Sequence, residues 1–294
     1  MSDTKPSKLP PTTMAAASAL FIFFWASGFI AAKFGLPYAE PFTFLTLRFL
    51  VALAILVPLA ILWRADWPSS LGVIGHIIVA GLLVQTIYLI GVFYGVYLGI
   101  STGVIALIVG LQPLITGALA APVLGERVTA RQWAGLALGF VGLGLVVAEK
   151  VDLASGQAWG AAFGALALAG ITLGTLYQKR FCAETDIRVA VTIQNGISLT
   201  VIAILAVSVE TMVINWTGEF VFALLWSGIG LSVIAIYLYY LLVRHGAASK
   251  VTSLIYLSPP TTALMGWLMF DEIFAPMAML GMLIAVAGVA LANR

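Results

Sequence analysis

Ten apolar runs, each close to the length of a membrane-spanning helix, fill almost the whole chain. A helix needs roughly 20 apolar residues to cross the hydrocarbon core of a bilayer. Hydrophobic residues make up 62% of the sequence and charged residues only 9%, which excludes an ordinary soluble domain. The runs lack the polar and apolar alternation of membrane-barrel strands. The sequence therefore predicts an all-α integral membrane protein with ten transmembrane helices, at 14–32, 42–63, 71–93, 100–124, 131–148, 158–178, 189–209, 220–243, 251–270 and 275–292.

The positions of the basic residues predict how these helices are oriented. If the N-terminus lies in the cytoplasm, eleven lysines and arginines fall on the inner side, and only Lys33 and Lys150 fall on the outer side. Cytoplasmic loops carry such an excess of positive charge. We therefore expect both termini to be cytoplasmic.

The first apolar run has a competing interpretation as a secretory signal peptide, because Lys5 and Lys8 precede it. The run is about 19 residues long, it lacks a convincing cleavage site, and it has a counterpart later in the chain. We therefore interpret it as the first membrane helix. The single cysteine, Cys182, lies in a predicted cytoplasmic loop and has no partner for a disulfide.

The two halves of the chain match each other at a shift of 146 residues. LQPLIT from Leu111 aligns with LSPPTT from Leu257, and glycines further along the two halves align as well. A single identical residue is weak evidence for a repeat in such an apolar chain. One shift that aligns prolines, loop acids and glycines together indicates an internal repeat. The predicted organisation is a cytoplasmic tail (1–13), a first five-helix repeat (14–148), a linker (149–157) and a second repeat (158–294).

Five helices per repeat is an odd number, so the second repeat crosses the membrane in the opposite orientation. The charges agree, since Lys33 is predicted outside and its counterpart Lys179 inside. Inverted repeats related by an axis in the membrane plane are the architecture of many secondary transporters. This architecture is the main functional signal of the sequence.

Several segments resemble the EamA family of the drug/metabolite transporter superfamily. They are WASGFIAAKFGL at 25–36, PFTFLTLRFLVA at 41–52, and the run from Leu111 through GER at 125–127 into a glycine-spaced helix. The resemblance covers both repeats and implies ten helices, a place in the bacterial inner membrane, and export of small metabolites, often amino acids. The group includes aromatic amino acid exporters of the YddG type. It also implies that the first, third, fourth, sixth, eighth and ninth helices surround a central cavity.

The predicted spans contain no aspartate or glutamate. Intramembrane carboxylates are the usual proton or cation carriers of pumps and antiporters, so we expect zwitterionic or neutral substrates. Two histidines, one loop cysteine and no membrane carboxylate also provide no cluster for catalysis or for a metal. We therefore expect no enzyme activity, cofactor, metal or nucleic-acid partner, and interactions with a small-molecule substrate and the lipid bilayer.

Apart from Arg131 at the first position of a span, Arg48 is the only formally charged side chain within a predicted span. It has two interpretations: it attracts a substrate carboxylate, or it lies close enough to the outer helix end to reach the interface or a neighbouring carbonyl. His76 could titrate, but a single histidine is also a common packing residue. Gln85 and Tyr88 lie on one helical face. The complete set of candidate substrate-binding residues is Trp25, Arg48, His76, Gln85, Tyr88, Gln112, Tyr237, Tyr256 and Ser258.

Gln112 and Pro113 form a polar break in an apolar run. The proline removes one backbone donor and frees a carbonyl one turn earlier, which a membrane tolerates where protein or a water-filled cavity satisfies that group. In the second repeat, Pro259 and Ser258 occupy the equivalent positions. We expect the two breaks to face each other, with Gln112 and Ser258 bordering the cavity, although a static kink is the alternative.

Paired small residues predict where the helices bend and where they touch. The expected hinges are Gly28, Pro113, Gly174 and Pro259. Gly135, Gly139 and Gly142 lie on one face of the fifth helix, as Gly281 and Gly288 do on the tenth, so that the backbones can approach closely. A dimer contact is the alternative, but one chain already contains both repeats, so we expect a functional monomer.

The sequence favours a secondary transporter with a midplane site between the repeats. A channel or structural membrane subunit is an alternative, and a membrane-embedded enzyme is a weaker one. Two proline-broken helices in an inverted repeat suit a carrier that opens to each side in turn.

Overall fold

The computed structural model describes residues 10–124, 129–150, 157–235, 238, 242, 257–274 and 276–292. Within these ranges the chain is helical apart from short joints and one isolated bridge between Ala39 and Ile214. The first repeat consists of α1 (Pro11–Gly35), α2 (Pro41–Leu62), α3 (Leu71–Gly81), η1 (Leu82–Ile87), α4 (Tyr88–Tyr97), α5 (Thr102–Gly110), α6 (Gln112–Leu124) and α7 (Ala130–Lys150). The second consists of α8 (Gln157–Phe181), α9 (Ile187–Val209), α10 (Gly218–Leu225), η3 (Trp226–Ala235), α13 (Ser258–Phe270) and α14 (Pro276–Ala292).

These elements correspond in order to the ten predicted segments, and the predicted fold class is confirmed. Seven helical stretches of the described chain are long and apolar enough to cross a membrane. Shorter apolar stretches lie in α7 and α14, at Ala130–Val146 and Pro276–Gly288. The remaining predicted membrane helix, at 251–270, corresponds to α13, which covers the later part of that segment.

The first two helices begin earlier than predicted, at Pro11 and Pro41. Proline fixes a helical φ and lacks only an N–H that the first turn would leave unpaired. Prolines that precede an apolar run therefore belong to the helix.

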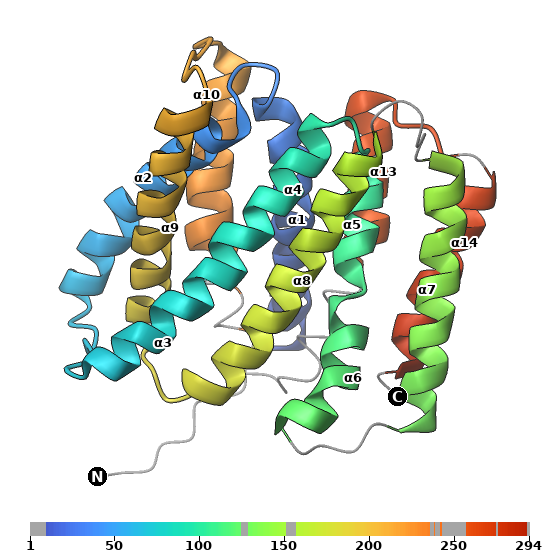
Figure 1. Ribbon diagram of the computed structural model, residues 1–294, viewed down its shortest axis with the longest axis horizontal. Helices are drawn as coiled ribbons and strands as arrows, with labels where there is room; N and C mark the ends of the chain where they lie inside the picture. The colour runs from blue at the N-terminus through green and yellow to red at the C-terminus, as the bar shows by residue number, and fades with distance from the viewer. Residues whose placement is uncertain are drawn as a thin grey trace.

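Helices of the two repeats pack against each other in equivalent pairs (Figure 1). The helix α2 lies along α9, and α7 lies along α14; the members of each pair are related by the 146-residue shift. The contact of η1 with α8 likewise repeats as that of η3 with α1. The bundle is thus built around the axis that relates the repeats.

The α7–α14 contact is made by glycines at one flank of the bundle, where Figure 1 shows the two helices side by side. A Cβ atom on Gly281 would lie 2.6 Å from the carbonyl oxygen of Gly142, and one on Gly288 would lie 2.6 Å from that of Gly135. The small-residue faces therefore serve packing within one chain.

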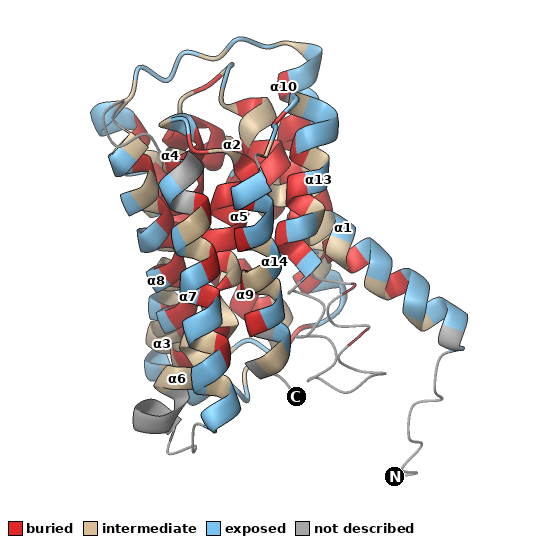
Figure 2. Ribbon diagram, turned by 90° about the vertical axis from the view of Figure 1, so that its right-hand side faces the viewer, coloured by how far each residue is buried: buried red, intermediate tan, exposed pale blue. Residues whose placement is uncertain are grey.

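Buried residues concentrate inside the bundle, and exposed residues cover its outer surface (Figure 2). Phe44, Phe49, Phe93 and Phe220 are completely buried. Exposed apolar side chains such as Leu283 and Val141 lie on the outside of α14 and α7, where a membrane protein meets lipid.

Replacing Gly142 with leucine should destabilise the protein, because a side chain there would meet the backbone of Gly281 and Ala285 on α14. Overpacking typically costs about 1–3 kcal/mol, and we expect the midpoint of thermal unfolding in detergent to fall. Gly144→Leu is the matched control, because a Cβ atom on Gly144 has no neighbour within 4 Å. Equal midpoints for the two variants would contradict this packing role.

Candidate functional site

A cavity of about 130 Å³ lies between the two repeats. Its walls are mainly aliphatic and aromatic, and they include a few polar side chains from α2, η1, α4, α9 and η3. The lining residues are Trp25, Gly28, Phe29, Arg48, Val84, Gln85, Tyr88, Leu89, Val92, Phe93, Ile171, Asn195, Leu231, Ser232 and Ala235.

Equivalent positions of the two repeats meet in this cavity. Trp25 and Ile171, Gln85 and Leu231, and Leu89 and Ala235 all line it, and the members of each pair are separated by the repeat shift of 146 residues. A cavity lined by both members of such pairs lies at the axis between the repeats, where inverted-repeat transporters hold their substrates.

Two π-helical segments border the cavity. Val84 and Gln85 lie in η1, and Leu231, Ser232 and Ala235 lie in η3. The shift of 146 residues carries Leu82–Ile87 into the range of Trp226–Ala235, so the two π-helical segments are equivalent in the repeats. A π-helical turn replaces i→i+4 hydrogen bonds with i→i+5 bonds and is frequent at functional sites.

Arg48 brings a positive charge to the cavity. Its relative exposure is 7%, and its Nε has no hydrogen-bond partner among the described residues. A buried donor of an ionised group that lacks a partner is costly. The guanidinium is therefore well suited to an anionic ligand, and a carboxylate fits its planar donor fork.

The other polar groups of the cavity are uncharged. Asn195 donates from Nδ2 to the carbonyl oxygen of Val191 at 2.7 Å, which leaves its side-chain oxygen as an acceptor. Gln85, Tyr88 and Ser232 also line the space. The described residues that line the cavity include no carboxylate, so this part of the lining offers one cation, several hydrogen-bonding groups and aromatic faces.

The structure brings together four of the predicted site residues, Trp25, Arg48, Gln85 and Tyr88, with the predicted hinge residue Gly28 beside them. The predicted residues Tyr237 and Tyr256 lie outside the described residues. His76, Gln112 and Ser258 are described but do not line this cavity.

Gln112 contacts polar groups away from the cavity. Its Nε2 lies 3.3 Å from the hydroxyl oxygens of Thr116 and Thr175. The helix breaks at Leu111, between α5 and α6. The two proline breaks do meet, because a Cβ atom on Gly110 would lie 2.7 Å from Cγ of Pro259.

The other described candidates serve as packing contacts in this structure. His76 Nδ1 lies 2.8 Å from the Tyr177 hydroxyl, and its ring stacks on Phe181 with centroids 4.7 Å apart. Gly174, predicted as a hinge, lets α8 approach Leu83 and Val84 of η1. Both contacts join the first repeat to the second.

Sequence reasoning missed Asn195 and Ser232. The signal for Asn195 was present, because Gln194 and Asn195 form a polar doublet within the apolar run 189–209. Polar residues in a membrane helix generally face the bundle interior. Ser232 gave no comparable signal, since an isolated serine can bond within its own helix.

Comparison with known proteins identifies the family. The model of the EamA-like transporter family matches the chain twice, at residues 12–148 and 158–294. The chain belongs to this family. The resemblance seen in the sequence is thereby confirmed, and the protein is a membrane transporter.

Two relatives align with nearly the whole chain of this EamA-like transporter. The uncharacterized transporter YvbV of Bacillus subtilis is 26% identical over 97% of this chain and 93% of its own length. The chloroplastic WAT1-related protein At3g02690 of Arabidopsis thaliana is 25% identical over 92% of this chain and 67% of its own length. One crystal structure, 20% identical in sequence, has a TM-score of 0.67 and covers 96% of this chain and 97% of that chain, which shows the fold alone.

The start of α2 and the end of α9 are joined at one face of this EamA-like transporter. We call it the Glu210 face; it consists of segments 36–40, 98–101, 210–217 and 271–274 and lies at the top of Figure 1. The Glu210 carboxylate accepts hydrogen bonds from the backbone N–H groups of Phe42 and Thr43 at 2.8 and 2.7 Å, and one from the Tyr94 hydroxyl at 3.1 Å. It therefore caps the N-terminus of α2, where a negative charge is favourable.

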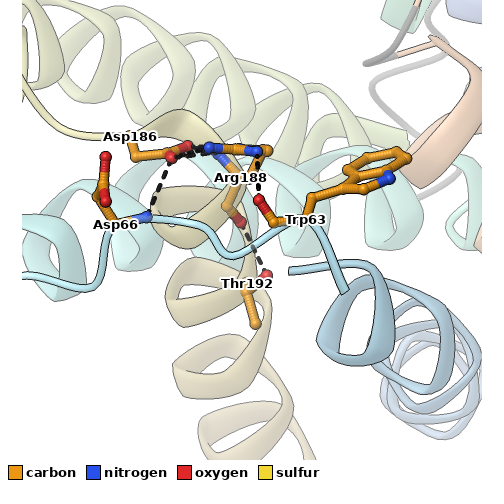
Figure 3. Close-up of polar contacts among 5 residues, drawn as sticks. All are labelled: Trp63, Asp66, Asp186, Arg188 and Thr192. Carbon is orange, nitrogen blue, oxygen red and sulfur yellow. Dashed lines mark hydrogen bonds and ion pairs between the residues drawn. The ribbon is translucent and has the colours of Figure 1, made fainter. Parts of the chain in front are cut away.

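The opposite face, which we call the Asp186 face (segments 63–70 and 182–186), also has a carboxylate at a helix start. Asp186 caps α9 by accepting from the N–H of Arg188 at 2.9 Å, and it also accepts from the N–H of Asp66 at 3.3 Å. Arg188 donates to Asp186 and to the carbonyl oxygen of Trp63, and its own carbonyl accepts from Thr192 (Figure 3). The hydrogen bond from Arg188 holds the pKa of Asp186 below its usual value.

A second contact at the Glu210 face joins α1, α5 and α13. Lys33 donates to Glu272 at 2.7 Å, and the Thr102 N–H and hydroxyl donate to the same carboxylate at 3.1 and 2.9 Å. Burial raises the pKa of Glu272, but these hydrogen bonds outweigh it and hold the pKa below its usual value of 4.5.

Glu272→Gln should lower stability at neutral pH, because the charge-assisted bonds of Glu272 are lost. A carboxylate with a depressed pKa stabilises the protein above its unfolded pKa, and this contribution disappears as the pH falls through the folded pKa. We expect a thermal midpoint about 2–4 °C below wild type at pH 7, and a difference that shrinks as the pH falls from 4.5 through the lower folded pKa of Glu272.

Asp271→Asn is the matched control, since Asp271 is exposed and its φ of 52° is accessible to asparagine. A Glu272→Gln difference that stays constant from pH 7 to pH 3.5 would show that the ionised contact does not contribute.

Proposed function

We propose that this protein is a secondary transporter that exports small neutral amino acids across the bacterial inner membrane by alternating access. The substrate binds in the central cavity between the repeats. The excess of basic residues at the Asp186 face supports a cytoplasmic location for that face and for both termini.

The observation that carries this proposal is Arg48, a buried cation with an unpartnered Nε at the cavity. A substrate carboxylate would provide the missing partner through charge-assisted hydrogen bonds. An inorganic cation would be repelled by the same charge.

The rest of the cavity supports an amino acid. An ammonium group can bind against aromatic ring faces, and Trp25, Phe29 and Tyr88 provide them. Since a buried water needs about 10–15 Å³ of such a space, the cavity of about 130 Å³ has room for roughly ten water-sized groups. That is the size of a single amino acid, aromatic ones being near the upper limit.

Alternating access requires contacts that can separate without dismantling the bundle. At the Glu210 face, the Glu210 carboxylate after α9 accepts from the first turn of α2. At the Asp186 face, Asp186 before α9 accepts from the N–H of Asp66, which follows α2. The α2–α9 pair therefore suits a fixed support. The Lys33–Glu272–Thr102 contact ties α1 to α5 and α13, and we propose that it separates when the cavity opens toward the Glu210 face.

Arg48→Gln should reduce amino acid exchange by at least about tenfold, because the substrate carboxylate loses its charged partner. Arg48→Lys should keep part of the activity, since lysine retains the charge but lacks the planar fork. Counterflow of a panel of labelled amino acids into proteoliposomes measures both, and the flux should saturate with concentration.

Arg131→Gln, which changes an exposed arginine at the start of α7, is the control and should exchange substrate at the wild-type rate. Normal exchange by a well-folded Arg48→Gln variant would refute the carboxylate role. Flux that does not saturate would favour a channel.

A further inference from the structure

We propose that Thr86 lines the cavity in the other state of the transport cycle, when η1 takes the register that η3 has in this structure. Here the Thr86 hydroxyl is instead bonded to Ser198 of α9, and this bond breaks at each switch. The inference rests on the proposed alternating access and adds to the site a residue that reaches the cavity in one state only.

The two π-helical segments present different positions of the repeat to the cavity. η1 and the first turn of α4 contribute Val84, Gln85, Tyr88 and Leu89, and η3 contributes Leu231, Ser232 and Ala235. Under the shift of 146 residues, the η3 set corresponds to positions 85, 86 and 89, each one residue later than 84, 85 and 88. The side of η3 that borders the cavity is therefore displaced by one residue.

The neighbouring helices show the same displacement. Gly174 of α8 and Gly28 of α1 are equivalent under the shift. A Cβ atom on Gly174 would contact Leu83 and Val84, whereas one on Gly28 would contact Leu231, the counterpart of position 85, at 3.3 Å. The cavity lining and the helix contacts thus both indicate that η1 and η3 have registers that differ by one residue.

Thr86 is held away from the cavity by α9. Its hydroxyl donates to the Ser198 hydroxyl at 2.9 Å, and the two residues are 3% and 0% exposed. The position of α2 that is equivalent to Ser198 is Ala52, which has no hydroxyl, so η3 cannot form the corresponding bond to α2. The Thr86–Ser198 bond therefore favours one register in the first repeat alone.

The register of η3 also satisfies the hydroxyl group at this position. The Ser232 hydroxyl donates to the Ser227 carbonyl, five residues back, at 3.5 Å, and the corresponding acceptor for Thr86 is the carbonyl of Gly81. Ser198 can bond to a carbonyl of its own helix, as serine commonly does. Since a buried hydroxyl without a partner is costly, this exchange of partners keeps the free-energy difference between the two registers small.

The inverted repeats connect the two registers to the two states of transport. If two inverted repeats exchange their conformations, the structure opens to the opposite side of the membrane, and η1 acquires the register of η3. The change is confined to η1, because α4 beyond it packs on α8, where a Cβ atom on Gly91 would meet the backbone of Phe163 and Ala167. Thr86 then enters the cavity, and Val84 turns away from it.

The test measures how fast single cysteines react with 2-sulfonatoethyl methanethiosulfonate, an anionic thiol reagent that Arg48 does not repel. The native Cys182 is removed by Cys182→Ala, and Thr86→Cys and Ser198→Cys are made separately in that background. We expect the Thr86→Cys variant to react at least about tenfold faster, because only this position reaches the cavity in the other state.

Ser198→Cys is the matched control, since the two side chains are in contact and both are buried. Gln85→Cys, at a position that lines the cavity in this structure, sets the time that complete reaction requires.

A disulfide between the two positions tests whether transport needs this movement. The hydroxyl oxygens lie 2.9 Å apart, so sulfur atoms in their places are close enough to form a bond of about 2.05 Å. The double variant Thr86→Cys/Ser198→Cys should lose exchange of the labelled amino acids on oxidation and regain it on reduction. The activity of either single variant should not change with these treatments.

Equal reaction of the Thr86→Cys and Ser198→Cys variants, within the time that Gln85→Cys reacts completely, would overturn the inference. Undiminished exchange by the cross-linked double variant would also overturn it. If the register switch fails while amino acid exchange is saturable and depends on Arg48, the proposed function stands. If no amino acid shows such exchange, the proposed function fails, and the cysteine reactivities still decide whether Thr86 reaches the cavity.

Discussion

The interior of a bilayer offers no water to a polar group, and the arrangement of this bundle follows from how its few buried polar atoms are satisfied. Glu210 and Asp186 lie at opposite faces, where each pairs with the free N–H groups of a helix start. Arg48 is different, because it is buried at the cavity with an unpartnered Nε. Among the described residues, these paired charges thus lie at the two faces, and one buried cation lies at the cavity.

The inverted repeat explains why similar contacts occur at both faces. Glu40 and Asp186 are equivalent under the repeat shift, and each carboxylate accepts hydrogen bonds from a loop of the other repeat, Glu40 from Thr211 and Asp186 from Asp66. The repeats have nevertheless diverged inside the cavity. Arg48 is equivalent to Gln194, and Trp25 to Ile171, so a symmetric framework surrounds an asymmetric cavity.

The sequence predicted the framework better than the site. Apolar runs and the repeat shift determine the helices, because membrane burial imposes length and composition directly. Arg48, Gln85 and Tyr88 were also predicted, since polar groups in a membrane helix point inward. Gln112 and Ser258 were expected at the cavity, but inward-facing side chains can also bond to a neighbouring helix, as Gln112 does with Thr175. Sequence periodicity does not distinguish these two outcomes.

The π-helical segments were not predicted, because hydrophobic periodicity does not reveal whether a backbone N–H bonds four or five residues back. Each wide turn contains one more residue than the helix around it. Moving that turn along the helix exchanges hydrogen bonds without changing how many are made, and it rotates the residues passed by about one third of a turn. η1 and η3 therefore provide, in each repeat, a way to change which side chains face the cavity while every helix stays in place.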